Sequence, residues 1–467
     1  MKKVCSMLLA VLLVLSLCAC GSSEKEPEGL QAGFGKVNIT PGYTVQLAGG
    51  AATRMSDGYQ EFLYLTIVAL KAQGQTFLIG TMDFICAEDV FVDPAKAAIS
   101  DATGVPEENI LLNATHTHAS VAIRSSGTEN VDKYREEFFG WAVECAEQAI
   151  ADLSPATVTY GSTHAEGMAY VRHYELDNGT FAGSNFGSFS SGTIVAHSTD
   201  ADDELQLIRF TRAAEDKKDI VMANFPAHAT LTQNNTSLSA DFPAPFRDYV
   251  EENGDVLCAY FIAAAGDQTP SSKIPGEAFS TDYKVYGAEL GRIAVETLNT
   301  MEAAEGDQIC FSAQTVTYGY NKEKLDKLAD AQQVKLIWDA VGRASEQGKA
   351  AAKEYGFASV YEVSAVINRG DAPDTNSMDI KVLAVGDVSF IFAPYEMFGQ
   401  TAIDIKSRSP YPMTFVITCA EGAEGYLPTR RGWEIGSYES HVSRFEPGTA
   451  ENLANDFVTM LEGLKNN

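Results

Sequence analysis

Short apolar runs alternate along the chain with longer segments whose apolar residues recur at helical spacing. The first pattern predicts β-strands and the second predicts amphipathic helices. Predicted strands cover residues 32–39, 62–70, 76–84, 110–114, 157–160, 205–211, 220–225, 256–263, 309–318, 381–385, 388–392 and 413–419. Predicted helices cover 94–103, 131–152, 242–252, 281–301, 322–355 and 450–464, the fifth as a pair broken near Gly342 or Gly348. The pattern predicts an α/β fold of mixed β-sheets flanked by helices, and no internal repeat is recognisable.

Many of the predicted strands stop directly at polar residues. These strand-end residues are His116, His118, His228, Asp267, Thr269, Glu396 and Tyr426. Active sites of α/β proteins are commonly assembled from strand ends, so we expect the active site there. Residues 179–192 are rich in Gly and Ser, and they are predicted to form a long loop.

His116 and His118 follow directly on the apolar run 110–112. In an extended chain, residues i and i+2 point to the same side, so both imidazoles can face one cleft. Neutral imidazole is the commonest metal ligand, which makes a metal site one interpretation of this pair. A pair of exposed loop histidines, or a single histidine bonded within the core, remains the alternative.

The first residues of the chain are typical of a bacterial lipoprotein signal. Lys2 and Lys3 precede an apolar stretch at residues 7–17, and Leu17-Cys18-Ala19-Cys20 then forms a lipobox. We expect a signal peptide at 1–19, a lipidated Cys20, a polar tether over 20–31 and one domain over 32–467. The protein would then lie outside the cytoplasm in the bacterial cell envelope, bound to the membrane through its lipid anchor.

The formal net charge of −29 makes the surface strongly acidic. Such a surface repels nucleic acid, so no nucleic-acid partner is expected, and no protein partner is inferred. Five cysteines follow Cys20, all in apolar contexts and without CxxC spacing. We interpret them as buried free thiols rather than a disulfide framework or a zinc-thiolate site.

Taken in order, the strand-end motifs resemble those of the catalytic domain of the neutral (non-lysosomal) ceramidase family, zinc-dependent hydrolases of the N-acyl bond in ceramide. The resemblance runs from about Ala32 to the C-terminus. The motifs that carry it are GKVNITP at 35–41, NATHTH at 113–118, FPAH at 225–228, SADFP at 239–243, GDQTP at 266–270, Glu396 in PYE, GYLPT at 425–429, and Tyr438-Glu439.

The resemblance implies one Zn²⁺ bound by His116, His228, Glu396 and Tyr426. It places His118 toward the substrate and Arg172 near the scissile group, where both are expected to stabilise the oxyanion as hydrogen-bond donors. Tyr438 is expected to line the same cleft, and Thr269 stands where the family has a serine regarded as catalytic. These last four residues, Thr269, His118, Arg172 and Tyr438, are the expected catalytic set.

Three departures from the family pattern bear on specificity. Thr269 keeps the hydroxyl of the family serine but adds a methyl group that restricts its rotamer. Ala229-Thr230-Leu231 follows His228 in place of a Gly-Thr-Ser-like run. We also expect no C-terminal immunoglobulin-like domain within 32–467. Ceramide specificity is therefore not carried over with the zinc chemistry.

The sequence thus predicts a zinc-dependent hydrolase of an N-acyl amide in a lipid or small amphiphile. A related zinc hydrolase of an ester or another amide is the first alternative. A non-catalytic solute-binding lipoprotein is the second, but all four expected ligands are present.

Overall fold

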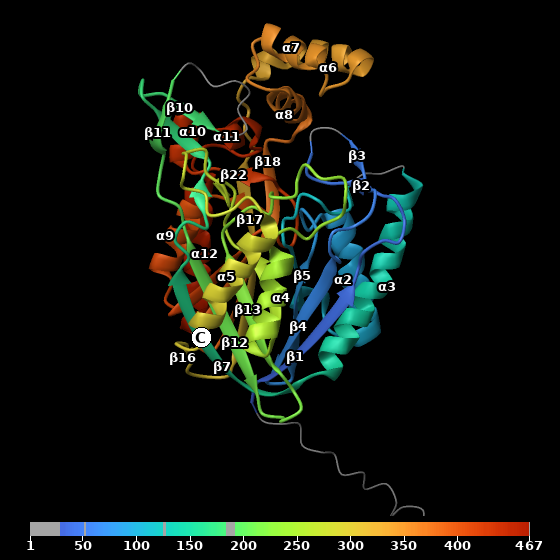
Figure 1. Cartoon of the computed structure of the whole chain (residues 1–467), viewed down its shortest axis with the longest axis vertical. Helices are drawn as coiled ribbons and strands as arrows, with labels where there is room; N and C mark the ends of the chain where they lie inside the picture. The colour runs from blue at the N-terminus through green and yellow to red at the C-terminus, as the bar shows by residue number, and fades with distance from the viewer. Residues whose placement is uncertain (1–28, 51–52, 125–127, 184–191, 467) are drawn as a thin grey trace, which may run out of the picture.

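Two β-sheets lie face to face in the middle of the molecule, and helices cover their outer faces (Figure 1). Apolar side chains from both sheets form the core between them, where the rings of Phe77 and Phe311 lie 5.3 Å apart. This arrangement confirms the predicted fold of mixed sheets flanked by helices.

The computed structural model describes residues 29–50, 53–124, 128–183 and 192–466. The signal peptide predicted at 1–19, the lipidated Cys20 and most of the tether over 20–31 lie outside these residues. No helix in the described ranges is both long and apolar enough to cross a bilayer.

One topological unit occurs three times in the described chain. Its first three strands run antiparallel to one another, a helix follows, the fourth strand lies parallel to the third, and a second helix comes after it. A parallel pair needs a crossover connection, and the first helix of each unit supplies it. The sequence shows no matching repeat, so the repetition is one of topology.

The elements of each unit are as follows. Unit 1 contains β1 (Gln31–Asn38), β4 (Tyr64–Ala72), β5 (Gln75–Met82), α2 (Asp89–Thr103), β6 (Ile110–Ala114) and α3 (Glu129–Ala151). Unit 2 contains β7 (Ser154–His164), β12 (Glu204–Arg212), β13 (Asp219–Phe225), α4 (Pro243–Gly254), β14 (Val256–Ile262) and α5 (Tyr283–Thr297). Unit 3 contains β17 (Ile309–Gly319), β18 (Thr375–Val385), β19 (Val388–Phe392), α9 (Gly399–Arg408), β21 (Met413–Ile417) and α12 (Thr449–Lys465).

Units 1 and 2 share one nine-stranded sheet, ordered β14-β13-β12-β7-β1-β4-β5-β6, with β16 (Glu302–Ala303) paired to β7. They join through a short contact, in which Gln31 and Ala32 pair with Pro155 and Ser154. Unit 3 forms the second sheet, ordered β17-β18-β19-β21. Helices of units 1 and 2 pack on the outer face of the large sheet, and α9 and α12 pack on that of the small one.

The final strands of the three units meet at one end of the sandwich. The Ala114 N–H donates to the Cys419 carbonyl at 3.1 Å, and the Thr418 N–H donates to the Ile262 carbonyl at 3.2 Å. These backbone bonds join the ends of β6, β14 and β21. Residues that follow the strands in all three units are therefore brought together.

Helices α6 (Leu328–Val341), α7 (Glu346–Glu354) and α8 (Val360–Asp371) lie between β17 and β18 in the chain and form a small satellite at the top of Figure 1. They share their own apolar cluster, which includes Trp338 and Phe357. The predicted helical pair is confirmed, and its break falls at Gly342, whose φ of +88° is left-handed. The remaining short elements are β2 (Gln46–Leu47), β3 (Arg54–Met55), β8 (Tyr170–Val171), β9 (His173–Leu176), β10 (Phe181–Gly183), β11 (Ile194–His197), β15 (Gln268–Thr269), β20 (Glu396–Met397), β22 (Tyr426–Leu427), α10 (Arg430–Ile435), α11 (Tyr438–Val442), and the 3₁₀ turns Glu107–Asn109 and Leu325–Lys327.

The predicted helix 94–103 and the predicted loop 179–192 differ from the structure. Helix α2 begins at Asp89, before Pro94, because Phe91 and Val92 are buried on its first turn and anchor it to the core. The predicted loop 179–192 begins instead as strand β10, whose Phe181 and Ala182 pair with β9. Its residues 184–191 lie outside the described ranges.

Candidate active site

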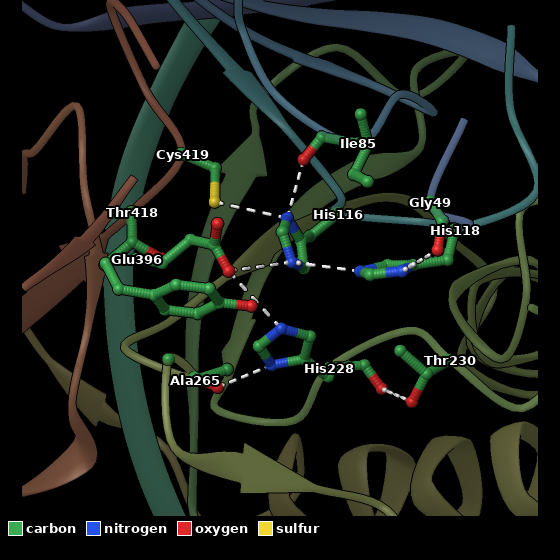
Figure 2. A network of polar contacts seen from close by, with 12 residues as sticks. Gly49, Ile85, His116, His118, His228, Thr230, Ala265, Glu396, Thr418 and Cys419 are labelled. Atoms are coloured by element: carbon green, nitrogen blue, oxygen red, sulfur yellow. Dashed lines mark hydrogen bonds and ion pairs between the residues drawn. The ribbon is translucent and has the colours of Figure 1, made fainter. Parts of the chain in front are cut away.

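Three imidazoles and one carboxylate converge where the three units meet (Figure 2). His116 and His118 follow β6 of unit 1, His228 follows β13 of unit 2, and Glu396 follows β19 of unit 3. Glu396 Oε2 lies 3.3 Å from His116 Nε2 and 3.4 Å from His228 Nε2. The Nε2 atoms of His116 and His118 are 3.3 Å apart. Each unit thus contributes a side chain to one buried cluster.

Backbone carbonyls hold the outer nitrogen of each imidazole. The Nδ1 atom lies 2.6 Å from the Ile85 carbonyl in His116 and 2.6 Å from the Ala265 carbonyl in His228. In His118 it lies 3.2 Å from the carbonyl of Gly49. Because a carbonyl only accepts, each Nδ1 carries the donated proton, and each Nε2 points inward to the cluster. This anchoring is typical of histidines that bind a metal.

The backbone at His116 brings the two neighbouring imidazoles together. Its φ of +64° is left-handed, so the chain turns sharply after β6 instead of continuing as a strand. The His116 and His118 rings lie 4.9 Å apart at 77°. Both histidines do face one site, but through this turn and not through the strand alternation used to predict it.

The charges of the cluster are strongly coupled. Burial opposes a charge on His116, yet the Glu396 carboxylate beside it raises the pKa of this imidazole to about 10. Burial, together with Arg172 and His116, lowers the pKa of His228 to about 4. Burial and the two other imidazoles hold the pKa of His118 well below its usual range. The cluster therefore favours one positive charge, which lies on His116 and is paired with the Glu396 carboxylate.

The cluster fits a metal cation. Neither His228 Nε2 nor Glu396 Oε2 has a hydrogen-bond partner, although both atoms are buried. A neutral imidazole lone pair and a carboxylate oxygen are both acceptors, so their 3.4 Å approach is unfavourable unless a cation balances them. Imidazole and carboxylate are common zinc ligands. The donor set therefore matches the expected Zn²⁺.

Tyr426 lies beside this cluster on β22. Strands β20 and β22 pair in parallel with Glu396 opposite Tyr426, and Arg172 Nη2 donates to the Tyr426 hydroxyl at 3.2 Å. Burial and the Glu396 carboxylate raise the pKa of the phenol, while Arg172 opposes them. The phenol is therefore protonated when no cation is near, and binding it to a metal would release a proton.

Arg172 is held by Glu439, a residue that the sequence did not single out as functional. Arg172 Nε donates to Glu439 Oε1 at 2.8 Å, Arg172 Nη2 donates to the Gly266 carbonyl at 2.8 Å, and His173 Nε2 lies 2.7 Å from Glu439 Oε2. Burial opposes the charge of Glu439, yet Arg172 and His173 lower its pKa to about 2. In sequence, Glu439 is an ordinary acidic residue at a helix start, since Ser437 caps α11.

The other two expected catalytic residues lie farther out. Tyr438 packs its ring 5.9 Å from that of Tyr426 and 5.4 Å from that of Tyr361 in α8. The Thr269 hydroxyl contacts Ser271, and the described residues show no hydrogen bond from it to the histidines or Glu396. Tyr438 thus adjoins the cluster, whereas Thr269 is separate from its hydrogen-bond network.

The geometry alone does not show which of His116 and His118 binds the metal and which faces the substrate. Both present Nε2 to the same cluster, but His116 is 1% exposed and His118 is half-buried. The assignment of His116 to the metal and His118 to the substrate stays a prediction.

Two thiols flank His116 on its outer side. The Cys419 Sγ lies 3.4 Å from His116 Nδ1, and Cys86 belongs to the same group of atoms. The five cysteines of the described chain are all free, as predicted, but Cys86 and Cys310 are only partly buried. The placement of two of them beside the cluster was not foreseen.

No protein-family model matches the chain, and no curated protein sequence matches it. Among solved structures, it is similar to a ceramidase complexed with C2, with a TM-score of 0.67 and 14% identity over 94% of this chain and 76% of the other. It is also similar to the neutral ceramidase from Pseudomonas aeruginosa, with a TM-score of 0.66 and 16% identity over 94% and 75% of the two chains. The chain therefore has a ceramidase-like fold, and the predicted resemblance is confirmed at the level of the fold.

Proposed function

We propose that the protein is a zinc-dependent hydrolase of an N-acyl amide bond in a lipid or small amphiphile. The observation that carries this proposal is the convergence of His116, His228 and Glu396, one from each unit, with buried acceptor atoms that lack partners. The ceramidase-like fold supports the choice of an amide bond.

His116, His228, Glu396 and Tyr426 would hold one Zn²⁺. When bound, zinc supplies Lewis acidity to the scissile carbonyl and lowers the pKa of water toward neutrality. The Glu396 carboxylate and a Tyr426 phenolate would reduce the net charge of the site. Arg172, at 3.2 Å from the Tyr426 hydroxyl, favours the phenolate form.

His118 would move a proton during the reaction. Its Nδ1 is committed to the Gly49 carbonyl and its pKa is lowered, so the neutral ring offers Nε2 as an acceptor. His118 would take a proton from the attacking water and return it to the leaving amine. This order of events makes it a general base first and a hydrogen-bond donor only afterwards.

Arg172 supplies a fixed positive charge. The Glu439 carboxylate and the Gly266 carbonyl hold its guanidinium, so little reorganisation is needed when negative charge develops on the substrate. Tyr438 would line the cleft beside Tyr426. Thr269 would take part in catalysis only if its hydroxyl moved from Ser271 toward the cluster.

The lipobox ending in Cys20 supports a location on the outer face of the bacterial membrane, with the domain tethered by a lipid. Such a position would bring the site close to amphiphilic substrates in or near the bilayer. This proposal is tested by lipid labelling of the wild type and of a Cys20→Ala variant.

The function is tested by measuring metal content and hydrolysis on the same preparation. We expect one zinc per chain, and chelator-sensitive release of fatty acid from N-acyl substrates. Full zinc without hydrolysis of any acyl-amide or acyl-ester would contradict the amidase proposal while sparing the metal site. Hydrolysis of esters alone would favour the esterase alternative.

A further inference from the structure

A polar cavity of about 450 Å³ lies between helix α8 and the end of α11 with the segment that follows it. Three arginines line it, Arg124, Arg369 and Arg444, with Asp371 as the one acidic residue in its lining. The chain as a whole carries a net charge of −29. A cavity whose charged lining residues are mainly cationic runs against this overall composition.

Arg369 is a buried cation with neutral partners. It is 5% exposed, and its guanidinium donates to the backbone carbonyls of His441 at 2.7 Å and Ser443 at 3.0 Å, with a longer bond to that of Glu323. No carboxylate of the described residues lies within ion-pair distance, and Nε has no partner. Burial lowers the pKa of this group, which reflects the cost of its charge.

A purely structural role would explain Arg369 alone, because its bonds clamp α8 to the segment after α11. It would not explain why two further arginines line the same cavity. Arg124 is 64% exposed along its side chain and Arg444 39%. Their ion pairs, with Glu88 at 3.5 Å and Glu424 at 3.2 Å, are to residues outside the cavity lining.

We propose that this cavity binds a phosphate or sulfate group, either free or carried by a larger molecule. A guanidinium presents paired N–H donors whose spacing matches the oxygens of such anions. A bound anion would also compensate the buried charge of Arg369. The volume is within the range of small-molecule sites.

The cavity adjoins the proposed active site without being part of it. Ser443 lines the cavity, and its hydroxyl donates to the Tyr426 carbonyl at 3.0 Å. An anion bound here would therefore lie next to the segment that carries Tyr426. The inference does not depend on the hydrolase activity, because binding is measured directly.

The test is calorimetric titration of the full domain with inorganic phosphate and with sulfate at low ionic strength. We expect saturable binding of one anion, weakened about tenfold in Arg124→Ala and in Arg444→Ala, as for the loss of one charge-assisted contact. Both residues are partly exposed, so these variants should fold, and thermal unfolding checks this. Arg431→Ala removes an exposed arginine paired with Glu434 outside the cavity, and should bind like the wild type.

Titration with a short alkyl phosphate distinguishes the two sources of the anion. Tighter binding than inorganic phosphate would support a larger phosphorylated ligand, and equal binding would support the free ion. Absence of saturable binding for all three probes would overturn the proposal. Equal weakening in Arg431→Ala and the two cavity variants would also overturn it, since it would show a diffuse surface effect.

Discussion

Two buried polar regions of this protein contain adjacent residues, one Thr115 and the other His116, but are built differently. Thr115 donates to Asp83 Oδ1 at 3.1 Å, and Arg247 donates to both oxygens of Asp83, at 2.9 Å and 2.7 Å. The Tyr64 N–H completes the set at 2.8 Å. Each acceptor of this region faces donors, so its charges balance without any ligand.

The histidine cluster lacks such balance. His228 Nε2 and Glu396 Oε2 are buried without a hydrogen-bond partner, although Asp83, His228 and Glu396 all lie at strand ends of the same fold. Burial is therefore a poor guide to function by itself. What separates a structural ion pair from a candidate metal site is whether every buried donor and acceptor already has its partner.

The largest effect is expected at the histidine cluster. Glu396→Gln and His116→Ala should lose bound zinc and lower kcat/KM more than about 10³-fold, beyond the 10- to 100-fold typical of residues that only support a ligand. Metal analysis and steady-state kinetics check both effects. Full zinc retention by both variants would refute the ligand assignment.

At the ion pair of Asp83 and Arg247, the expected effect is on stability alone. Arg247→Met leaves the Asp83 carboxylate buried without its cation and should lower the free energy of unfolding by about 3–5 kcal/mol. Zinc content and activity per folded molecule should stay at wild-type values, as measured by denaturant titration beside metal analysis. A loss of zinc in this variant would show that the two regions are coupled.

Glu439 belongs to a third buried network and gives it a pH signature. Its pKa of about 2 is below the ordinary 4.5, so its ionised form stabilises the fold above pH 4.5, and this stabilisation is lost as the pH falls toward 2. The shift corresponds to at most about 3 kcal/mol. The gap in unfolding free energy between the wild type and Glu439→Gln should be constant above pH 4.5 and narrow below it. A gap that does not change with pH would contradict this account.

His118→Ala tests the division of roles between the two neighbouring histidines. We expect the variant to keep its zinc and to lose about 100-fold in kcat, as for removal of a general base. His116→Ala is the matched variant, since it should lose the metal. Loss of zinc from both would mean that His118 is also a ligand, and would overturn the expected division.

The smallest effect is expected at Thr269, whose hydroxyl bonds to Ser271 rather than to the cluster. Thr269→Ser should change kcat/KM by less than about threefold, and Thr269→Ala by less than about tenfold, which is below the contribution of a typical general acid or base. A loss above 100-fold in Thr269→Ala, rescued by Thr269→Ser, would instead establish a catalytic hydroxyl.

The sequence was a better guide to which residues lie at the site than to the backbone turns and contacts that hold them there. His228 and Glu396 could be found because each follows an apolar strand, and strand ends converge in α/β folds. The left-handed turn at His116 could not be predicted, because no local motif requires it. Glu439 was named within the Tyr438-Glu439 motif but given no role, because an acidic residue at a helix start is common, and only the fold shows that Arg172 and His173 reach it.

The threefold unit was also invisible in the sequence. Topology depends on which strands pair, and periodicity reports only how each strand is buried. Pro94 misled the prediction of α2 because proline usually opens a helix, whereas here Phe91 and Val92 anchor an earlier start.

The meeting of the three units has a consequence for assembly of the protein. Because His116, His228 and Glu396 come from different units, a chain with only two units docked would offer an incomplete set of metal ligands. Zinc would then be retained only by molecules that have finished folding, and metal occupancy would indicate that all three units have docked. Partly folded chains would be distinguishable from completely folded ones by the absence of bound metal alone.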